Sequence, residues 1–308
     1  MMMSSTSGAR HLTPDAQICV LGLGRMGRPV ALNLAQRGFQ VSGWNRTPPR
    51  PLQGVRALSG EAGLRRVVAG ADVVVLALSD RSAIECVLLA PATLQALRPG
   101  VTVIDMGTTG PVAARAHARR LAEFGLAYLD APVSGGVKGA TDGALTILVG
   151  GALETFGRMA PAFSPLGTAH HLGDVGAGQV AKLANQIIVA DYIAAVAEGL
   201  RFAEGQGLDP MALLKALQGG FADSAILRQH GPRMAEGDFR PGGTCRLHLK
   251  DLVLARSVGG TEFARLVNAN AALQRLEGLV DAGQGELDHS AYYLTYYGDV
   301  SRSASPGD

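Results

Sequence analysis

The sequence predicts a doubly wound α/β domain followed by an all-α C-terminal domain, the two joined by a long inter-domain helix. Its 308 residues exceed the usual size of a single core, so two domains are expected. Short apolar runs alternate with helical segments in the first half, which is typical of a mostly parallel sheet with helices on both faces. After about Gly178 only helical periodicity remains. We therefore expect the α/β domain over residues 16–178 and the all-α domain over 179–308.

The first β–α–β unit of the α/β domain is predicted at the start of this range. Residues 17–21 form an apolar strand, a glycine turn leads into a helix over 26–37, and Gly38 closes that helix. Residues 39–44 form the second strand. Before this unit, residues 1–15 are rich in serine, threonine and glycine and lack the apolar core of a secretion signal, so we predict a disordered tail.

The same alternation continues through the rest of the domain. Further strands are predicted at 71–78, 101–105, 127–129 and 144–149, and a helix with proline near its start at 111–124. In the all-α domain, Asp209-Pro210 predicts a helix start and Gly219-Gly220 predicts a break.

Composition excludes several classes of protein. With 47% apolar residues, 18% charged residues and a net charge of +2, the chain is neither disordered nor suited to coating a nucleic acid, so a small-molecule partner is expected. Three cysteines without a CxxC or Cys/His pair support neither a disulfide framework nor a zinc site, and we predict no metal. A reducing compartment fits this pattern, and we expect the protein to be cytoplasmic.

No membrane partner is predicted. We find no stretch long and apolar enough to span a bilayer. The longest apolar region, residues 180–197, is interrupted by four polar or charged side chains: Lys182, Asn185, Gln186 and Asp191. We interpret it as a buried helix of a soluble protein.

A glycine turn follows the first strand and opens the first helix, with the spacing Gly22-x-Gly24-x-x-Gly27. The first glycine permits a tight turn, the second lets the backbone approach a pyrophosphate, and the third allows close helix–strand packing beside free N–H groups at the helix start. In this context the motif predicts a Rossmann-type dinucleotide site that includes Leu23, Arg25 and Met26. The alternative is an ordinary turn in a chain with 41 glycines.

Cofactor preference is expected at the end of the second strand. Asn45, Arg46 and Thr47 stand there, eighteen to twenty residues after Gly27. An acid at this position would bind the ribose 2′-OH of NAD, whereas an arginine pairs with the 2′-phosphate of NADP. We therefore predict NADP(H) preference with NAD(H) possible; alternatively, Arg46 only solvates a loop.

Two further segments are assigned by position. Leu78 and Ser79, at the end of the strand predicted over 71–78, are assigned to the cofactor site. After another apolar strand comes a small, open loop that contains Ser134, Gly135 and Gly136. Its N–H groups and the serine hydroxyl suit a substrate carboxylate, although a plain strand exit is equally possible.

Lys182 is a lone cation in an almost apolar helix. Asn185 and Gln186 follow it by three and four residues and so project from the same face. A lysine on a helix is often only a solvated charge. In a partly apolar cleft, however, an ammonium loses hydration and becomes a better proton donor, which is what carbonyl reduction needs.

Five ordered motifs together resemble the β-hydroxyacid dehydrogenase family, over about residues 17–297. They are Gly22-Leu-Gly-Arg-Met-Gly27, Asp105-Met-Gly-Thr108, Asp130-Ala-Pro-Val-Ser-Gly-Gly136, Gly178-x-x-x-Lys182 and Leu247-His-Leu-Lys250-Asp251. The details of the last two motifs, with Gln186 and Asp288-His-Ser-Ala, are most similar to the semialdehyde reductases of this family.

The resemblance implies reversible, NAD(P)H-dependent reduction of a small semialdehyde acid. In such enzymes the residue matching Lys182 protonates the forming alkoxide, and the loop matching Ser134–Gly136 holds the substrate carboxylate. Asn185 and Gln186 match residues that orient the lysine or the substrate, while Thr108 and Lys250 match residues beside the cofactor. Homodimers or homotetramers are expected.

Alternatives within and outside this family remain. A 3-hydroxyisobutyrate or 4-hydroxybutyrate type of dehydrogenase would carry the same motifs. An imine reductase has a similar fold but generally lacks the lysine, and a catalytically inactive nucleotide-binding module has no need of it. Polar residues Asp223 and Ser224, near Phe221, slightly favour a hydroxyl-rich substrate.

The chain also departs from the family pattern. Asn45 replaces an aspartate of the semialdehyde reductases, and Gly107 and Gly110 replace common serines, so the nicotinamide loop is expected to be looser.

Several other residues are assigned structural roles. His170-His171 is expected at a strand edge and not on a metal, and His248 has no assigned role beyond a possible contact behind the site. Four tyrosines are expected to pack a terminal helix and to contact another subunit: Tyr292, Tyr293, Tyr296 and Tyr297.

Overall fold

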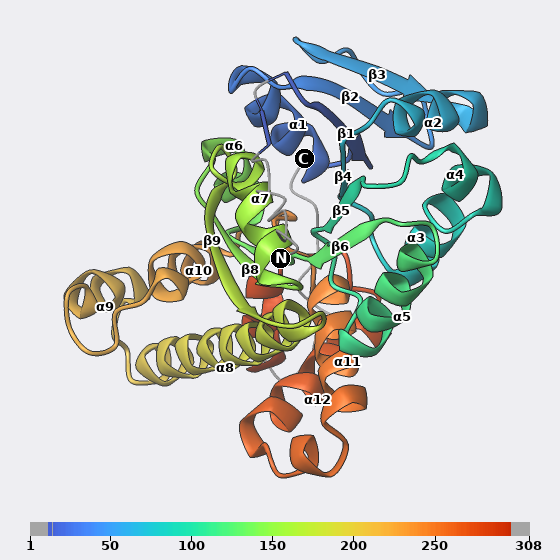
Figure 1. The fold of residues 1–308 in the computed structure, drawn as a ribbon. Coiled ribbons are helices and arrows are strands. Elements are labelled where there is room, and N and C mark those ends of the chain that lie inside the picture. The colour runs from blue at the N-terminus through green and yellow to red at the C-terminus, as the bar shows by residue number, and fades with distance from the viewer. Residues whose placement is uncertain (1–11, 14, 297–308) are drawn as a thin grey trace, which may run out of the picture. The chain divides into compact units, whose positions relative to one another are not determined.

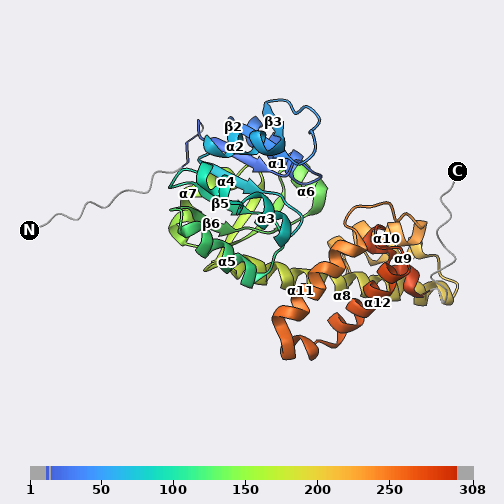
Figure 2. The same ribbon diagram turned by 90° about the vertical axis from the view of Figure 1, so that its right-hand side faces the viewer.

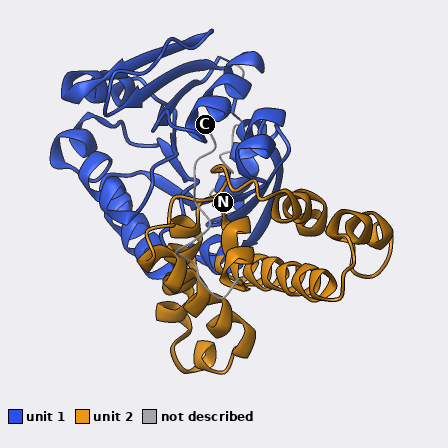
Figure 3. Ribbon diagram, turned by 180° about the vertical axis from the view of Figure 1, so that it is seen from behind, with its two compact units in different colours: residues 1–182 blue, residues 183–308 orange. Residues whose placement is uncertain are grey.

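The computed structural model describes residues 12, 13 and 15–296, and most of the predicted tail lies outside these. The chain divides into two compact units, residues 1–182 and 183–308, drawn in different colours in Figure 3. The division falls within one continuous helix, α8 (Ala177–Gly205). The predicted long helix is therefore present, and it begins at Ala177.

In the described part of unit 1 there is a nine-stranded sheet with the order β3-β2-β1-β4-β5-β6-β8-β7, and β9 pairs with β8. The strands from β3 to β6 are parallel, β8 is antiparallel to β6 and β7, and β9 is parallel to β8. From β1 the strand order runs to β2 and β3 on one side, and then from β4 to β5 and β6 on the other side of β1. This change in the order of the strands is the doubly wound arrangement. The predicted fold class is confirmed (Figure 1).

The strands of unit 1 are mostly short. They are β1 (Gln17–Leu21), β2 (Gln40–Asn45), β3 (Val55–Ser59), β4 (Val73–Leu76), β5 (Thr102–Asp105), β6 (Ala127–Asp130), β7 (Val133–Ser134), β8 (Leu145–Gly150) and β9 (Gly167–Gly173). The six strands predicted from sequence match β1, β2, β4, β5, β6 and β8. His170 and His171 lie on β9, at the strand position expected of them.

Helices cover both faces of this sheet (Figures 1 and 2). They are α1 (Gly27–Gln36), α2 (Gly60–Ala69), α3 (Arg81–Val87), α4 (Pro91–Ala96), α5 (Pro111–Ala122), α6 (Gly136–Asp142) and α7 (Leu153–Phe163). Buried side chains of α1, α6 and α7 pack in one apolar cluster, and those of α2 to α5 pack in another.

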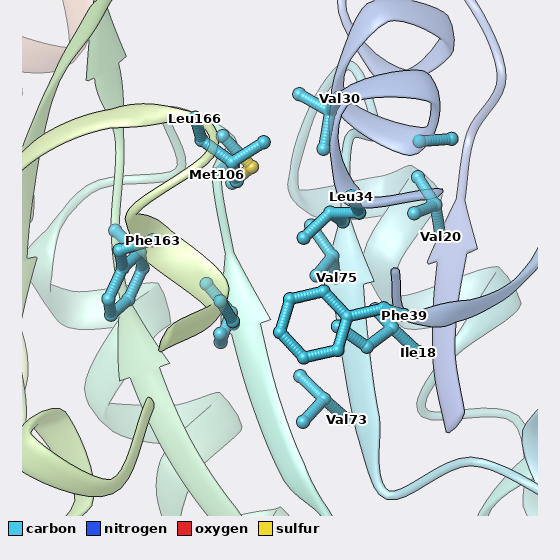
Figure 4. Packing of buried hydrophobic residues seen from close by; sticks show 14 of the residues in the cluster. Ile18, Val20, Val30, Leu34, Phe39, Val73, Val75, Met106, Phe163 and Leu166 are labelled. Carbon is cyan, nitrogen blue, oxygen red and sulfur yellow. The ribbon is translucent and has the colours of Figure 1, made fainter. Parts of the chain in front are cut away.

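Successive side chains of β1 point to opposite faces of the sheet and so contribute to both apolar clusters. Ile18 and Val20 point to the first, while Cys19 and Leu21 point to the second. Figure 4 shows the first cluster, in which α1 packs against the strands and Phe39 lies beside Ile18. Burial on both faces makes the central strands continuously apolar, which is why their sequences indicated a parallel sheet.

Unit 2 is helical within its described residues. After the second part of α8 come α9 (Pro210–Leu217), α10 (Ala225–Glu236), α11 (Cys245–Ala264), α12 (Val267–Asp281) and the 3₁₀ segment η1 (His289–Tyr296). Asp209 caps α9 by accepting hydrogen bonds from the N–H groups of Met211 and Ala212, as the predicted helix start required. The predicted break at Gly219-Gly220 separates α9 from α10.

Helix α8 corrects one prediction. By length and composition it is long and apolar enough to cross a membrane, and 28% of its most apolar window is buried. Its buried residues recur at helical spacing, however, and pack into the core of unit 2: Leu183, Ala190, Ile193, Ala197 and Leu200. This is the pattern of a core helix with one packed face.

Candidate cofactor and active site

The glycine turn has the geometry that its three roles require. Gly22 has a φ of 98°, and a Cβ there would lie 2.5 Å from the carbonyl oxygen of Ala77. A Cβ on Gly27 would lie 1.7 Å from the carbonyl oxygen of Gly22, so the helix packs directly on the turn. Gly24 has no atom within 4 Å of its would-be Cβ and is exposed. The open side of the turn, with its uncapped helix start, fits a pyrophosphate.

Asn45 ties the second strand to this turn. Its Oδ1 accepts a hydrogen bond from the Leu23 N–H at 3.2 Å, and its Nδ2 donates to the carbonyl oxygen and Oγ1 of Thr47 at 3.1 and 3.0 Å. The amide of Asn45 therefore holds the loop in shape, and the Arg46 side chain is exposed beside it.

The ends of three parallel strands bring predicted residues to the same edge of the sheet. The glycine turn follows β1, and Leu78 and Ser79 follow β4, whose end contacts Gly22. Thr108, half-buried, follows β5. Ligands of doubly wound sheets bind outside this edge, at the reversal between β1 and β4.

Two buried aspartates support this edge, and sequence reasoning gave neither a role. Asp105 ends β5; its Oδ1 accepts from the Gly107 N–H at 2.9 Å, and its Oδ2 accepts from the Tyr128 hydroxyl at 2.9 Å. Asp130 ends β6 and accepts from the N–H groups of Gly176 and Gln179 at 2.8 and 2.9 Å. Burial raises the pKa of Asp130 against these hydrogen bonds. The position of both aspartates at the end of a predicted strand was the feature of the sequence that could have indicated this role.

The start of α8 is closely packed against the sheet. A Cβ on Gly178 would lie 2.2 Å from the carbonyl oxygen of Leu148 and 2.7 Å from that of Asp130, so only glycine fits. Lys182 follows one helical turn later and is 8% exposed. The alternative of a solvated surface lysine is therefore wrong.

The loop predicted for the substrate carboxylate lies between β7 and α6. Ser134 ends β7 and is partly buried, while Gly135 and Gly136 are exposed and have φ angles of 122° and 63°. Positive φ at consecutive positions makes a backbone that other residues rarely adopt. No side chain caps the start of α6, so its N–H groups remain open to an acceptor.

In unit 2, helix α11 holds α8 at Gln186. The Gln186 Nε2 donates to the Asp251 Oδ2 at 2.7 Å, and the Asp251 Oδ1 lies 3.1 Å from the Lys250 Nζ. The Asn185 Nδ2 donates to the Gln186 Oε1 at 3.0 Å. Thus three residues predicted from sequence are linked through Asp251, which was not predicted.

His248 makes a second contact with the same residue. Its Nε2 lies 3.0 Å from the Gln186 carbonyl oxygen, and it must donate there because a carbonyl only accepts. Its Nδ1 lies 3.2 Å from the Nδ1 of His289. In its neutral form, His248 then accepts a hydrogen bond from His289, which fixes the tautomers of both rings.

Asp288 anchors this histidine cluster. Its Oδ2 accepts from the N–H groups of Gly242 and Gly243, and its Oδ1 accepts from the N–H and hydroxyl of Ser290. Ligand atoms of His230, Asp288 and His289 lie within 4.8 Å of one another, the one such group among the described residues. Because the carboxylate is saturated and Arg233 lies 3.6 Å away, a cation is disfavoured. That the chain binds no metal stays a prediction.

His289 gives unit 2 an expected sensitivity to acid. Burial, with His248 and His230 nearby, lowers its pKa to about 3. The unfolded chain then binds more protons than the folded one between about pH 6.5 and pH 3, so stability is lost as pH falls through this window. We expect urea unfolding to show about 2 kcal/mol less stability at pH 5 than at pH 7 from this group.

The variant His289→Gln should remove that part of the pH dependence. His170→Gln, on the exposed part of β9, is the matched control and should keep the wild-type slope. An unchanged slope in His289→Gln would assign the acid sensitivity to other groups.

One prediction in unit 2 stays a prediction and one is corrected. Ser224 caps α10 by accepting from the Leu227 N–H at 2.9 Å, and Asp223 accepts from the Gly219 N–H and pairs with Arg228. Both residues also line a pocket with Phe221, so their contact with a hydroxyl-rich substrate stays a prediction. Tyr292 and Tyr293 are buried within the core of unit 2, not presented to another subunit. Tyr297 lies outside the described residues.

Family models match both halves of the chain. Residues 17–178 match the NAD-binding domain of 6-phosphogluconate dehydrogenase, and residues 176–296 match the NAD-binding domain of NADP-dependent 3-hydroxyisobutyrate dehydrogenase. Together with the glycine turn at the sheet edge, they define an NAD(P)-dependent oxidoreductase that acts on CH–OH groups.

Relatives place the chain more closely. It is 40% identical over 88% of its length, and 94% of the relative's, to 2-hydroxy-3-oxopropionate reductase of Escherichia coli. It is 34% identical to 3-hydroxyisobutyrate dehydrogenase of Pseudomonas aeruginosa, covering 91% and 98% of the two chains. A structure of Mycobacterium tuberculosis 3-hydroxyisobutyrate dehydrogenase with L-serine matches at a TM-score of 0.79 and 31% identity, covering 91% and 99%. The chain belongs to the β-hydroxyacid dehydrogenase family.

Proposed function

We propose that this enzyme reduces tartronate semialdehyde to glycerate, reversibly and with NADPH preferred. The observation that carries the proposal is Lys182, a nearly buried cation one turn into a helix that is fixed to the cofactor edge of the sheet. The similarity to 2-hydroxy-3-oxopropionate reductase supports the choice of substrate.

In this proposal, the bound nicotinamide supplies the hydride, and Lys182 donates the proton to the forming alkoxide. Such a proton donor contributes about 10²–10⁴ in rate. Ser134 and the N–H groups of Gly135 and Gly136 hold the substrate carboxylate. Asn185 and Gln186, linked to each other and to Asp251, orient the substrate or the lysine.

The remaining assigned residues bind the cofactor. The turn from Gly22 to Gly27 binds the pyrophosphate, with Leu23, Arg25 and Met26 supplying its backbone. Leu78, Ser79 and Thr108 line the sheet edge beyond it, and Lys250 is assigned to the cofactor by family resemblance. In domain terms, residues 16–178 bind NAD(P), and residues 179–308 serve substrate binding and oligomerisation.

Arg46 is expected to favour NADPH over NADH by pairing with the 2′-phosphate. The variant Arg46→Ala should lower the kcat/KM for NADPH by about tenfold and leave that for NADH nearly unchanged, because one charge-assisted contact is lost. Arg56→Ala, on the neighbouring strand β3, is the control. A wild-type enzyme with higher kcat/KM for NADH would contradict the preference.

The substrate is tested with a panel of semialdehydes and both reduced cofactors. We expect the highest kcat/KM with tartronate semialdehyde, and lower values with methylmalonate and succinate semialdehydes. A clear preference for methylmalonate semialdehyde would instead identify a 3-hydroxyisobutyrate type of enzyme, and one for succinate semialdehyde a 4-hydroxybutyrate type. Turnover of a cyclic imine alone would overturn the reaction class.

We also propose a cytoplasmic enzyme that acts as a homodimer or homotetramer. The three cysteines are free, which suits a reducing compartment. Exposed apolar residues on α8, including Ile188, Tyr192 and Phe202, are suitable for contact with a second copy. Sedimentation of the purified enzyme measures the assembly.

A further inference from the structure

Gln179 is a buried amide that the proposed reaction does not yet use. It is 0% exposed. Its Oε1 accepts hydrogen bonds from the N–H groups of Thr109 and Gly110, both at 2.9 Å, and its Nε2 donates to the Gly107 carbonyl oxygen at 2.9 Å. One side chain therefore satisfies three backbone groups of a single loop, out of four hydrogen bonds that an amide can make.

That loop connects β5 to α5 and carries Thr108, the residue assigned to the nicotinamide. At its start, Gly107 is fixed by the Asp105 carboxylate. At its end, Gly110 has a φ of 83°, a conformation that favours glycine. Neither glycine has a side chain that could fix the loop, so these two positions are held through their backbone, and Gln179 makes three hydrogen bonds to the loop.

The backbone at Gln179 is also fixed to the sheet. Its own N–H donates to the Asp130 Oδ2 at 2.9 Å, and the adjacent Gly178 packs on two carbonyl oxygens of the sheet. Lys182 follows three residues later on the same helix, about one turn away. The loop and the proton donor are thus joined through one side chain and one turn of helix.

We propose that Gln179 is a positioning residue that sets the loop Gly107–Gly110, and with it the nicotinamide, at a fixed distance from Lys182. This inference rests on the proposed function. Gln179 touches no reacting atom in it. Without the amide, two buried N–H groups and a carbonyl lose their hydrogen-bond partner, so the loop is expected to relax toward water.

The variant Gln179→Met tests this role, because methionine has a similar volume and makes none of the three hydrogen bonds. We expect kcat to fall about 10- to 30-fold, since small misplacements of reacting groups are costly, while the substrate KM changes little. The primary deuterium isotope effect on kcat, measured with NADPH deuterated at the transferred position, should rise because hydride transfer becomes slower. Gln206→Met, exposed just after the end of α8, is the matched control.

Gln179→Glu provides a second variant, which keeps both acceptor bonds; when ionised, its second carboxylate oxygen faces the Gly107 carbonyl oxygen and cannot donate to it. Its loss of kcat should be smaller than that of Gln179→Met, and it keeps the test decisive if the methionine variant does not fold. A lower melting temperature with unchanged kcat and isotope effect in either folded variant would overturn the proposal, because Gln179 would then be merely structural.

The failure of the proposed function gives a different result. In that case wild-type enzyme does not turn over tartronate semialdehyde, and the comparison is made with whichever panel substrate it does reduce. Equal kcat and isotope effect for wild type and Gln179→Met on an active substrate would contradict the positioning role alone.

Discussion

Replacing Lys182 by methionine should lower kcat by about 10²–10⁴, while the enzyme still binds NADPH. Methionine keeps the length and much of the volume of the side chain, and Lys182 is nearly buried, so the apolar part of its packing is retained. In our proposal, the variant loses the group that donates a proton to the developing alkoxide. Water is a poor replacement for the lysine, because the gain in rate comes from a proton donor held in position beside the substrate.

The measurements are steady-state kinetics with the semialdehyde and a fluorescence titration with NADPH. Lys215→Met, on the exposed side of α9, is the control and should behave as wild type. A near-normal kcat in Lys182→Met would exclude this lysine as the proton donor. Loss of NADPH binding in the same variant would show that it acts on the cofactor instead.

Replacing Gly27 by alanine should weaken NADPH binding by at least about 100-fold and destabilise unit 1 by about 3 kcal/mol. The added Cβ would lie 1.7 Å from the Gly22 carbonyl oxygen, so the helix must move away from the turn. Since the same turn binds the pyrophosphate in our proposal, binding and stability should be lost together.

Gly24→Ala separates the two effects. No atom lies within 4 Å of a Cβ at Gly24, so the melting temperature should not change, while NADPH binding should weaken about tenfold as the methyl group enters the space of the pyrophosphate. Gly157→Ala, at an open position within α7, controls for the substitution itself. Normal NADPH affinity in Gly24→Ala would place the cofactor elsewhere.

Local patterns made much of unit 1 predictable. The strand, glycine turn and first helix follow one another within twenty residues of sequence, and their apolar spacing reports burial directly. The strands β3 and β7 were missed, and β9 was indicated only at His170-His171. Strand β7 has two residues, β3 has no buried residue, and partly buried and exposed residues alternate along β9. A weak apolar signal of this kind does not separate an edge strand from a loop.

The residues of the proposed site came from sequence patterns, whereas the contacts that hold them in place could not be predicted. Lys182, Asn185 and Gln186 are three and four residues apart on one predicted helix, so their spacing alone was enough to group them on one face. Gln179 and the loop Gly107–Gly110 are about seventy residues apart in the chain, and their contact depends on how β5 and β6 end side by side. Ser224, expected near the substrate, also caps α10, a role that the sequence analysis did not assign to it.

Asn45 gives the cofactor site a modular character. The amide of Asn45, and not Arg46, connects the second strand to the glycine turn, so the exposed arginine carries no share of the fold's stability through that contact. In our proposal Arg46 sets the nucleotide preference, so a substitution at this single exposed position should change that preference without loss of structure. An ancestral switch between the two dinucleotides, or an engineered one, would have few compensating changes to make.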